Sequence, residues 1–271
     1  MTKLAAINYQ RHGGKRWLSF GSDFGFAAQT AVVPLVVREL PKATMAFPIG
    51  FIREGKTLGP AAIMSLETKH NLFVAADGRW LGGYQPAALR SFPFRLIKTK
   101  SGEFALCIDE ESGLITDSKD GEPFFEGREI SAGLKQVLDF LTQFEQNKVA
   151  TERACVALER HDVIKPWTIT IKAGKEEKRI EGIYRIDEAA LKALPMESYD
   201  DLRQSNALLI AYCQLLSMQH LPELGRLTDA YAAQHQETEV ILHQSLRSRD
   251  AELINIDWSL FSNDSHEKGS T

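Results

Sequence analysis

Short apolar runs alternate with glycine-containing turns between residues 45 and 110. Three turns each lie between two such runs: residues 55–59 between 48–53 and 61–66, Asp77-Gly78 between 71–75 and 80–84, and Ser101-Gly102 between 94–99 and 103–108. Tight hairpin turns need positive φ, which glycine adopts at little steric cost. The pattern therefore predicts a meandering antiparallel sheet with hairpin turns.

The spacing of apolar residues changes to a helical period after residue 130. Steps of three and four residues predict a long helix over 130–161, with a break near Asn147. Further segments are predicted as two strands, 168–171 and 179–186, then helices over 188–194, 202–217 and 222–249. The expected fold class is α+β, with helices packed on an N-terminal antiparallel sheet and a helical C-terminal third. Residues 32–45 are predicted to form a short helix that ends near Pro41.

These patterns predict three parts within the 271 residues. A main α+β domain covers residues 1–220, and a helical arm covers 221–250. The tail, 251–271, begins with an apolar cluster and ends in a polar stretch that we expect to be disordered. Trp258 and Phe261 in that cluster form a candidate surface for a protein partner.

Charge and hydropathy exclude two classes of function. The net charge is -4 and the pI is about 6.0, without the basic field that nucleic-acid binders use, so no nucleic-acid partner is expected. The longest apolar run, residues 31–37, is far shorter than the roughly 20 residues of a membrane span. Three widely separated cysteines without a Cys-x-x-Cys pair indicate buried thiols, and a cytoplasmic location is expected.

A P-loop pattern, Gly-x-x-x-x-Gly-Lys-Thr, occurs at residues 50–57. Gly50, Gly55, Lys56 and Thr57 would bind the phosphates, and Asp109 and Glu110 would hold magnesium in a nucleotide hydrolase. A phosphate-binding loop must lead directly into a helix, but Gly59 and Pro60 follow within one turn. We therefore favour a hairpin turn with Lys56 in solvent.

No metal site or cofactor is expected. The acidic segment 109–122 lacks the residue order of a calcium loop. His235, Glu239 and His243 are spaced to share one face of a helix, but no fourth ligand accompanies them. Motifs for a hydrolase nucleophile, a zinc protease or a dinucleotide are also missing from the sequence.

An ordered series of short segments carries a family resemblance. It includes Val33-Pro34-Leu35-Val36, Phe47-Pro48-Ile49, Asn71-Leu72-Phe73-Val74, Asp77-Gly78-Arg79-Trp80, Phe92-Pro93-Phe94, Gly182-Ile183-Tyr184 and Ala211-Tyr212-Cys213-Gln214. The series resembles the bacterial SapC family up to about residue 227. This resemblance implies an accessory role in an envelope, surface-layer or uptake system, and it supplies no catalytic residues or cofactor to assign to this chain.

Two hypotheses remain open on the residues. The leading one is a non-enzymatic accessory or binding protein with a protein partner or a small ligand. The alternative is an enzyme that acts on a small ligand in a cleft beside the sheet. Its candidate polar groups are Asp77, Arg79, Arg90 and Asp109. Convergence of these four groups in one pocket would favour the enzyme.

Overall fold

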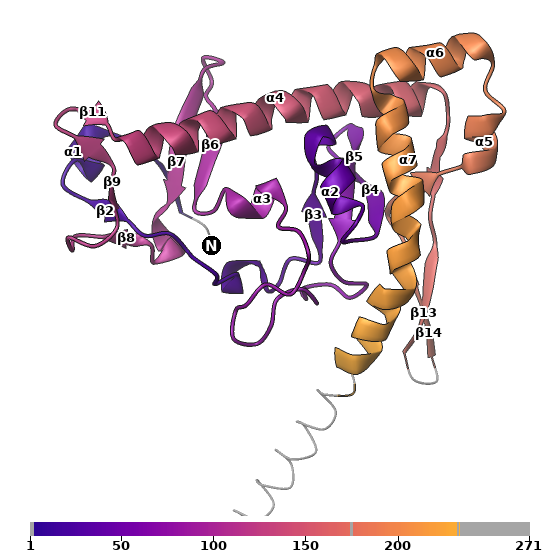
Figure 1. The fold of residues 1–271 in the computed structure, drawn as a ribbon, viewed down its shortest axis with the longest axis horizontal. Coiled ribbons are helices and arrows are strands. Elements are labelled where there is room, and N and C mark those ends of the chain that lie inside the picture. The colour runs from indigo at the N-terminus through magenta and orange to yellow at the C-terminus, as the bar shows by residue number, and fades with distance from the viewer. Residues whose placement is uncertain (1–2, 174–175, 232, 234–271) are drawn as a thin grey trace, which may run out of the picture. The chain divides into compact units, whose positions relative to one another are not determined.

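The computed structural model describes residues 3–173, 176–231 and 233 (Figure 1). By their contacts, residues 1–228 form one compact unit, and residues 229–271 form a second, most of which lies outside the described residues.

The N-terminal half of the first unit is built from short strands and single helical turns. Its elements are β1 (Leu4–Ala6), α1 (Tyr9–His12), β2 (Arg16–Trp17), η1 (Gly25–Ala27), β3 (Val32–Pro34), η2 (Val37–Glu39), α2 (Leu40–Ala43), β4 (Ile49–Glu54), β5 (Thr57–Ile63), α3 (Ala87–Arg90), β6 (Phe94–Lys98), β7 (Phe104–Asp109), η3 (Glu110–Ser112), β8 (Ile115–Thr116), β9 (Glu122–Pro123), β10 (Phe125–Glu126) and β11 (Glu129–Ile130).

The C-terminal half carries the longer helices. Its elements are α4 (Ala132–Arg160), β12 (Ile164–Pro166), β13 (Ile169–Ala173), β14 (Glu176–Ile180), β15 (Ile183–Ile186), α5 (Glu188–Lys192), α6 (Met196–Gln204), α7 (Ala207–Ser217) and η4 (Met218–His220). Residues 221–231 are helical as well.

Two of the three predicted hairpins are confirmed. β4 pairs with β5 around Gly55, and β6 pairs with β7 around Gly102, with φ of 62° and 90° at the two glycines. At the third site, Gly78 also has positive φ, but the turn is flanked only by a single bridge between Val74 and Trp80. No ladder extends from it, because Gly82, Gly83 and Pro86 soon follow and disfavour a strand.

The α+β class with antiparallel sheets is confirmed, but the hairpins do not form one continuous meander. β4 and β5 belong to a five-stranded sheet with the order β12-β15-β4-β5-β3. β6 and β7 belong to a three-stranded sheet with the order β1-β7-β6. The long irregular connection between β5 and β6 allows the two hairpins to join separate sheets.

Helix α4 is continuous through Asn147 and contributes to two hydrophobic cores. A small core forms around Phe94, Ile108 and Phe124, and Leu134 and Leu141 of α4 pack into it. A large core surrounds the five-stranded sheet and takes up Ala154, Cys155, Ala157 and Leu158 of α4. Figure 1 shows α4 extending from the β11 end of the unit, past β5 and β4, to α6 and α7. One helix therefore joins both cores.

Helix α7 closes a gap in the five-stranded sheet. The register that pairs Ile183 with Ile52 brings Ile186 opposite Ile49, and there the fully buried Gln214 bridges the strands. Its amide oxygen accepts from Ile186 N at 2.9 Å, and its amide nitrogen donates to Ile49 O at 3.2 Å. The predicted helix 202–217 is in fact two helices, because Asn206 adopts a left-handed conformation with φ of 60°.

Candidate functional site

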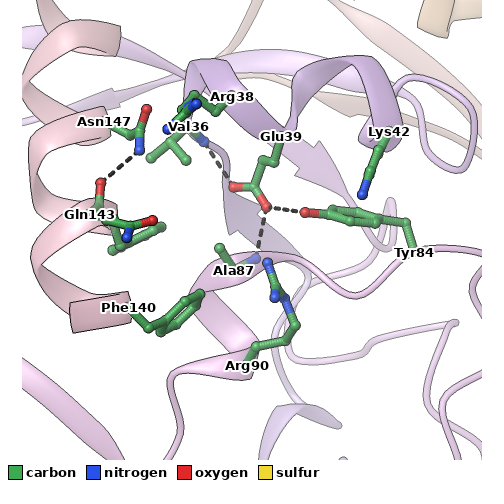
Figure 2. A pocket seen from close by; sticks show the side chains of 11 residues that line it. Val36, Arg38, Glu39, Lys42, Tyr84, Ala87, Arg90, Phe140, Gln143 and Asn147 are labelled. Carbon is green, nitrogen blue, oxygen red and sulfur yellow. Dashed lines mark hydrogen bonds between the residues drawn. The ribbon is translucent and has the colours of Figure 1, made fainter. Parts of the chain in front are cut away.

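A pocket of about 250 Å³ opens between α2, α3 and α4. It is lined by Val36, Arg38, Glu39, Lys42, Tyr84, Ala87, Arg90, Phe140, Gln143, Phe144 and Asn147 (Figure 2). The lining comes from three segments far apart in the sequence. It combines aromatic, amide and cationic side chains around one acidic group.

The segment before Phe47 provides three of the polar groups, and its conformation differs from the prediction. Instead of one helix that ends near Pro41, the chain forms β3, the 3₁₀ turn η2 and then α2, with Pro41 in the first turn of α2. Proline is well tolerated there because the first helical N–H groups have no partner within the helix. Val37 N donates to Thr151 Oγ1 of α4 at 2.8 Å, which fixes η2 against that helix.

Glu39 is buried at the base of the pocket, with an exposed fraction of 5%. One carboxylate oxygen accepts from Val36 N at 2.9 Å. The other accepts from Tyr84 Oη at 3.0 Å and from Ala87 N at 2.8 Å. Because Ala87 N is the first free donor of α3, Glu39 caps that helix from outside. Both oxygens are therefore already engaged within the protein.

Three cationic side chains line the same pocket as this carboxylate. Arg90 Nε donates to Gln85 O at 3.1 Å, and its guanidinium group lies 5.2 Å from the centre of the Phe140 ring. Lys42 and Arg38 are exposed, and none of the ion pairs among the described residues involves either of them. Three cations and one carboxylate leave the pocket with a formal charge of +2.

Tyr84 is a hydrogen-bond donor in this environment. Burial raises the pKa of Tyr84 to about 12, and the charge and hydrogen bond of Glu39 add to this effect. The neighbouring Arg90 acts in the opposite direction. At neutral pH the phenol is therefore protonated and remains able to donate to Glu39.

The groups that line the pocket are better placed to bind a ligand than Glu39 is to act as a base. A general base needs a free lone pair within reach of a substrate proton, but the oxygens of Glu39 accept three hydrogen bonds from the protein itself. Among the described residues that line the pocket there is no serine, threonine or cysteine, and there is no second carboxylate. The aromatic wall and the surplus cations are instead suited to hold an anion.

The four polar groups of the predicted cleft lie in three separate places. Arg90 lines the pocket. Arg79 Nε pairs with Asp77 at 3.0 Å on an exposed turn, and this pair holds the pKa of Asp77 below its usual range. Asp109 is buried at the start of η3, where it accepts from Lys3 N and Glu111 N, both at 3.1 Å. The four groups therefore do not share a cleft.

The P-loop pattern lies in a β-hairpin. Gly50 is within β4, Gly55 and Lys56 form the turn, and Thr57 begins β5. No helix follows the turn, so the amides of this segment do not converge as a phosphate site requires. Gly50 has a packing role, because a Cβ atom there would lie 2.6 Å from Ile183 Cγ2 on β15.

Several predicted features lie outside the described residues. These are Trp258 and Phe261 of the candidate interaction surface, and His235, Glu239 and His243. Within the described ranges, no group of His, Cys, Asp or Glu side chains is arranged to hold a metal ion. No helix in that part of the chain is both long and apolar enough to span a bilayer.

Glu39, Lys42 and Tyr84 were not recognised as site residues from the sequence. A local signal for Glu39 exists, because Arg38-Glu39 interrupts an otherwise apolar segment from Ala31 to Leu40. A charged residue in such a segment is rarely buried unless it has partners. Those partners, Tyr84 and Ala87, are too distant in sequence to be inferred from the local pattern.

Comparison with known protein families identifies the family of this chain. The family model SapC matches residues 7–224. The chain belongs to the SapC family. The matched region contains every residue that lines the pocket, so the pocket is part of the SapC domain itself. No curated protein and no solved structure matches the chain.

Proposed function

We propose that this SapC protein is a non-catalytic accessory protein that binds a small anion in the pocket beside Glu39. The observation that supports the proposal is the surplus of cations around a carboxylate that is already satisfied. Since Val36 N, Ala87 N and Tyr84 Oη engage Glu39, the charges of Arg38, Lys42 and Arg90 remain available to a ligand.

The geometry of the two inner cations accords with this role. Figure 2 shows Lys42 and Arg90 reaching from α2 and α3 toward the space next to Tyr84. Neither side chain is neutralised by an acidic neighbour in the described part of the chain other than the occupied Glu39. An anion placed between them would gain charge-assisted hydrogen bonds, which are stronger than neutral ones.

The cellular role that we propose is accessory to an envelope or uptake system, in the cytoplasm. The free thiols of Cys107, Cys155 and Cys213, all buried, accord with a reducing compartment. In this proposal the anion is the signal or cargo, and a protein partner contacts the C-terminal region that includes Trp258 and Phe261.

Calorimetry and thermal unfolding with phosphate, sulfate, succinate and citrate test the binding proposal. At least one anion should bind and raise the melting temperature as its concentration increases. Lys42→Gln combined with Arg90→Gln should abolish the effect. A matched control, Arg95→Gln with Lys98→Gln at two exposed positions of β6, removes the same charge outside the pocket lining and should leave binding unchanged.

Two results would contradict the proposal. The first is the absence of binding by every anion at low ionic strength, where electrostatic attraction is strongest. The second is equal loss of binding in the pocket variant and the β6 control, which would indicate a nonspecific response to net charge. Circular dichroism of both variants establishes that they remain folded.

A further inference from the structure

The pocket has two chemically different walls. Phe140, Gln143, Phe144 and Asn147 occupy positions i, i+3, i+4 and i+7 of α4, so they share one face of the helix. This wall presents two aromatic rings and two amide groups. The opposite wall, from η2 to α3, presents the cations described above. A ligand that contacts both walls therefore has an apolar part and an anionic part.

The volume of the pocket limits the size of this ligand. About 250 Å³ corresponds to roughly eight water molecules at about 30 Å³ each. Pockets for drug-sized molecules begin at about 300 Å³. A single ring with one or two acidic substituents fits this space, whereas a nucleotide or peptide would extend out of the open side of the pocket.

The formal charge of +2 and the state of Arg90 indicate the anionic part. Arg90 Nε is engaged by Gln85 O, and its guanidinium group also contacts the hydroxyl of Tyr84. The remaining N–H donors of the guanidinium group can bind oxygens of a carboxylate or phosphate group. Lys42 supplies a second, compact charge from the other side. Two negative charges on the ligand would neutralise the surplus.

From these features we infer that the ligand is a single flat ring that carries two negative charges, either an aromatic dicarboxylate or an aryl phosphate. The inference rests on the proposed anion site and adds the ring and the second charge. In the bound state the ring packs along Phe144 and Phe140, the acidic group meets Arg90 and Lys42, and Gln143 and Asn147 contact polar substituents at the ring edge.

A set of simple ligands separates the ring from the charge. Benzene-1,2-dicarboxylate and phenyl phosphate carry both features, benzoate has one charge fewer, and succinate and inorganic phosphate have no ring. Calorimetry should show that one of the first two binds about 10-fold more tightly than benzoate, because one charge-assisted interaction is added. It should also bind about 5-fold more tightly than its ringless counterpart, because the contact with the aromatic wall is added. The preference between the two aromatic dianions identifies the acidic group.

Two variants assign the effects to the walls. Phe144→Leu should remove the preference for ring compounds and leave succinate or phosphate binding unchanged. Lys42→Gln should reduce the preference for dianions over benzoate by about 10-fold. Phe104→Leu changes an exposed phenylalanine on β7 and should match the wild type in both measurements.

The outcomes distinguish this inference from the proposed function. If succinate or phosphate binds as tightly as the aromatic dianions, or if benzoate does, the inference is wrong while the anion site stands. If only sulfate or citrate binds and none of these five compounds does, the inference is wrong while the anion site stands. If no anion of either set binds, both are wrong. Binding of aromatic dianions that Phe144→Leu leaves unchanged would place their ring elsewhere and would also overturn the inference.

Discussion

The hydroxyl group of Tyr84 donates a 3.0 Å hydrogen bond to Glu39, a residue 45 positions earlier in the chain. A second bond anchors the same segment, from Trp80 Nε1 to Tyr84 O at 2.9 Å. Residues 64–86 contain no helix or strand, so bonds from side chains such as these hold the segment in its conformation. The Tyr84–Glu39 pair therefore fixes this long connection and the pocket together.

Glu39→Gln should destabilise the protein by about 2–3 kcal/mol. The amide keeps the shape of the carboxylate but directs an NH₂ group toward donors, so at least one of Val36 N, Ala87 N and Tyr84 Oη loses its acceptor. Denaturant unfolding measures the change. Glu54→Gln, at the exposed end of β4, is the matched control and should stay within about 0.5 kcal/mol of the wild type. Equal stability of the two variants would contradict the role of Glu39.

Tyr84 should ionise at a higher pH than an ordinary tyrosine. Because burial and Glu39 raise its pKa from 10.0 to about 12, the stability linked to the protonated phenol is fully present below pH 10.0 and is lost as the pH rises through about 12. Ultraviolet titration of the wild type and of Tyr84→Phe gives the Tyr84 contribution as a difference. If that difference develops around pH 10.0, the described environment of Tyr84 is wrong.

His12 should make the protein less stable in acid. Burial is the largest cause that lowers its pKa below 6.5, with smaller contributions from Arg11 and Lys15, while the Asn8 backbone and Glu110 oppose the shift. Below pH 6.5 the unfolded chain binds a proton that the folded chain does not. Stability is therefore full above pH 6.5 and falls through the folded-state pKa, by up to about 1.4 kcal/mol per pH unit.

The measurement for His12 is the free energy of unfolding of wild type and His12→Phe between about pH 7 and pH 5. The phenylalanine ring can keep the contact with Phe124, whose ring centre lies 5.2 Å from that of His12. The stability of the wild type relative to the variant should decrease as the pH falls. Parallel profiles would show that His12 does not titrate differently in the folded state.

Within the P-loop pattern, Gly50 in the strand should be important for stability and Lys56 in the turn should not. Gly50→Ala brings a Cβ atom within 2.6 Å of Ile183 Cγ2 and should cost about 1–3 kcal/mol. Lys56→Ala, in the exposed turn, should change stability by less than about 0.5 kcal/mol. ATP with magnesium should not raise the melting temperature of the wild type. An increase in melting temperature with nucleotide that Lys56→Ala abolishes would instead support the hypothesis of a phosphate-binding loop.

Gln214→Leu should cost about 3 kcal/mol. The leucine fits the buried volume but leaves Ile186 N and Ile49 O without partners between β15 and β4. Gln219→Leu provides a control at an exposed position two residues after α7 and should be nearly neutral. Similar melting temperatures for the two variants would mean that the strands close the gap without the glutamine.

The sequence was informative where the relevant interaction is local. Gly55 and Gly102 marked the two hairpins because positive φ at a turn is a property of single residues. The helical period found α4 because Leu134 and Leu141 recur on one face. The site was harder to predict from the sequence. The burial of its acidic group depends on hydrogen bonds from Tyr84 and Ala87, which lie 45 and 48 positions later. Such partners follow from the tertiary fold, and no local pattern encodes them.

Helix α4, with 29 residues at about 1.5 Å each, extends over about 43 Å without an interruption. The beginning of α4 packs in the small core and its end packs in the large core. One rigid helix therefore connects the two cores. Removal of the residues that form either core would expose the apolar face of this helix. The SapC domain should therefore unfold in one cooperative transition. A pulling force applied at one core is then transmitted to the other along the same helix.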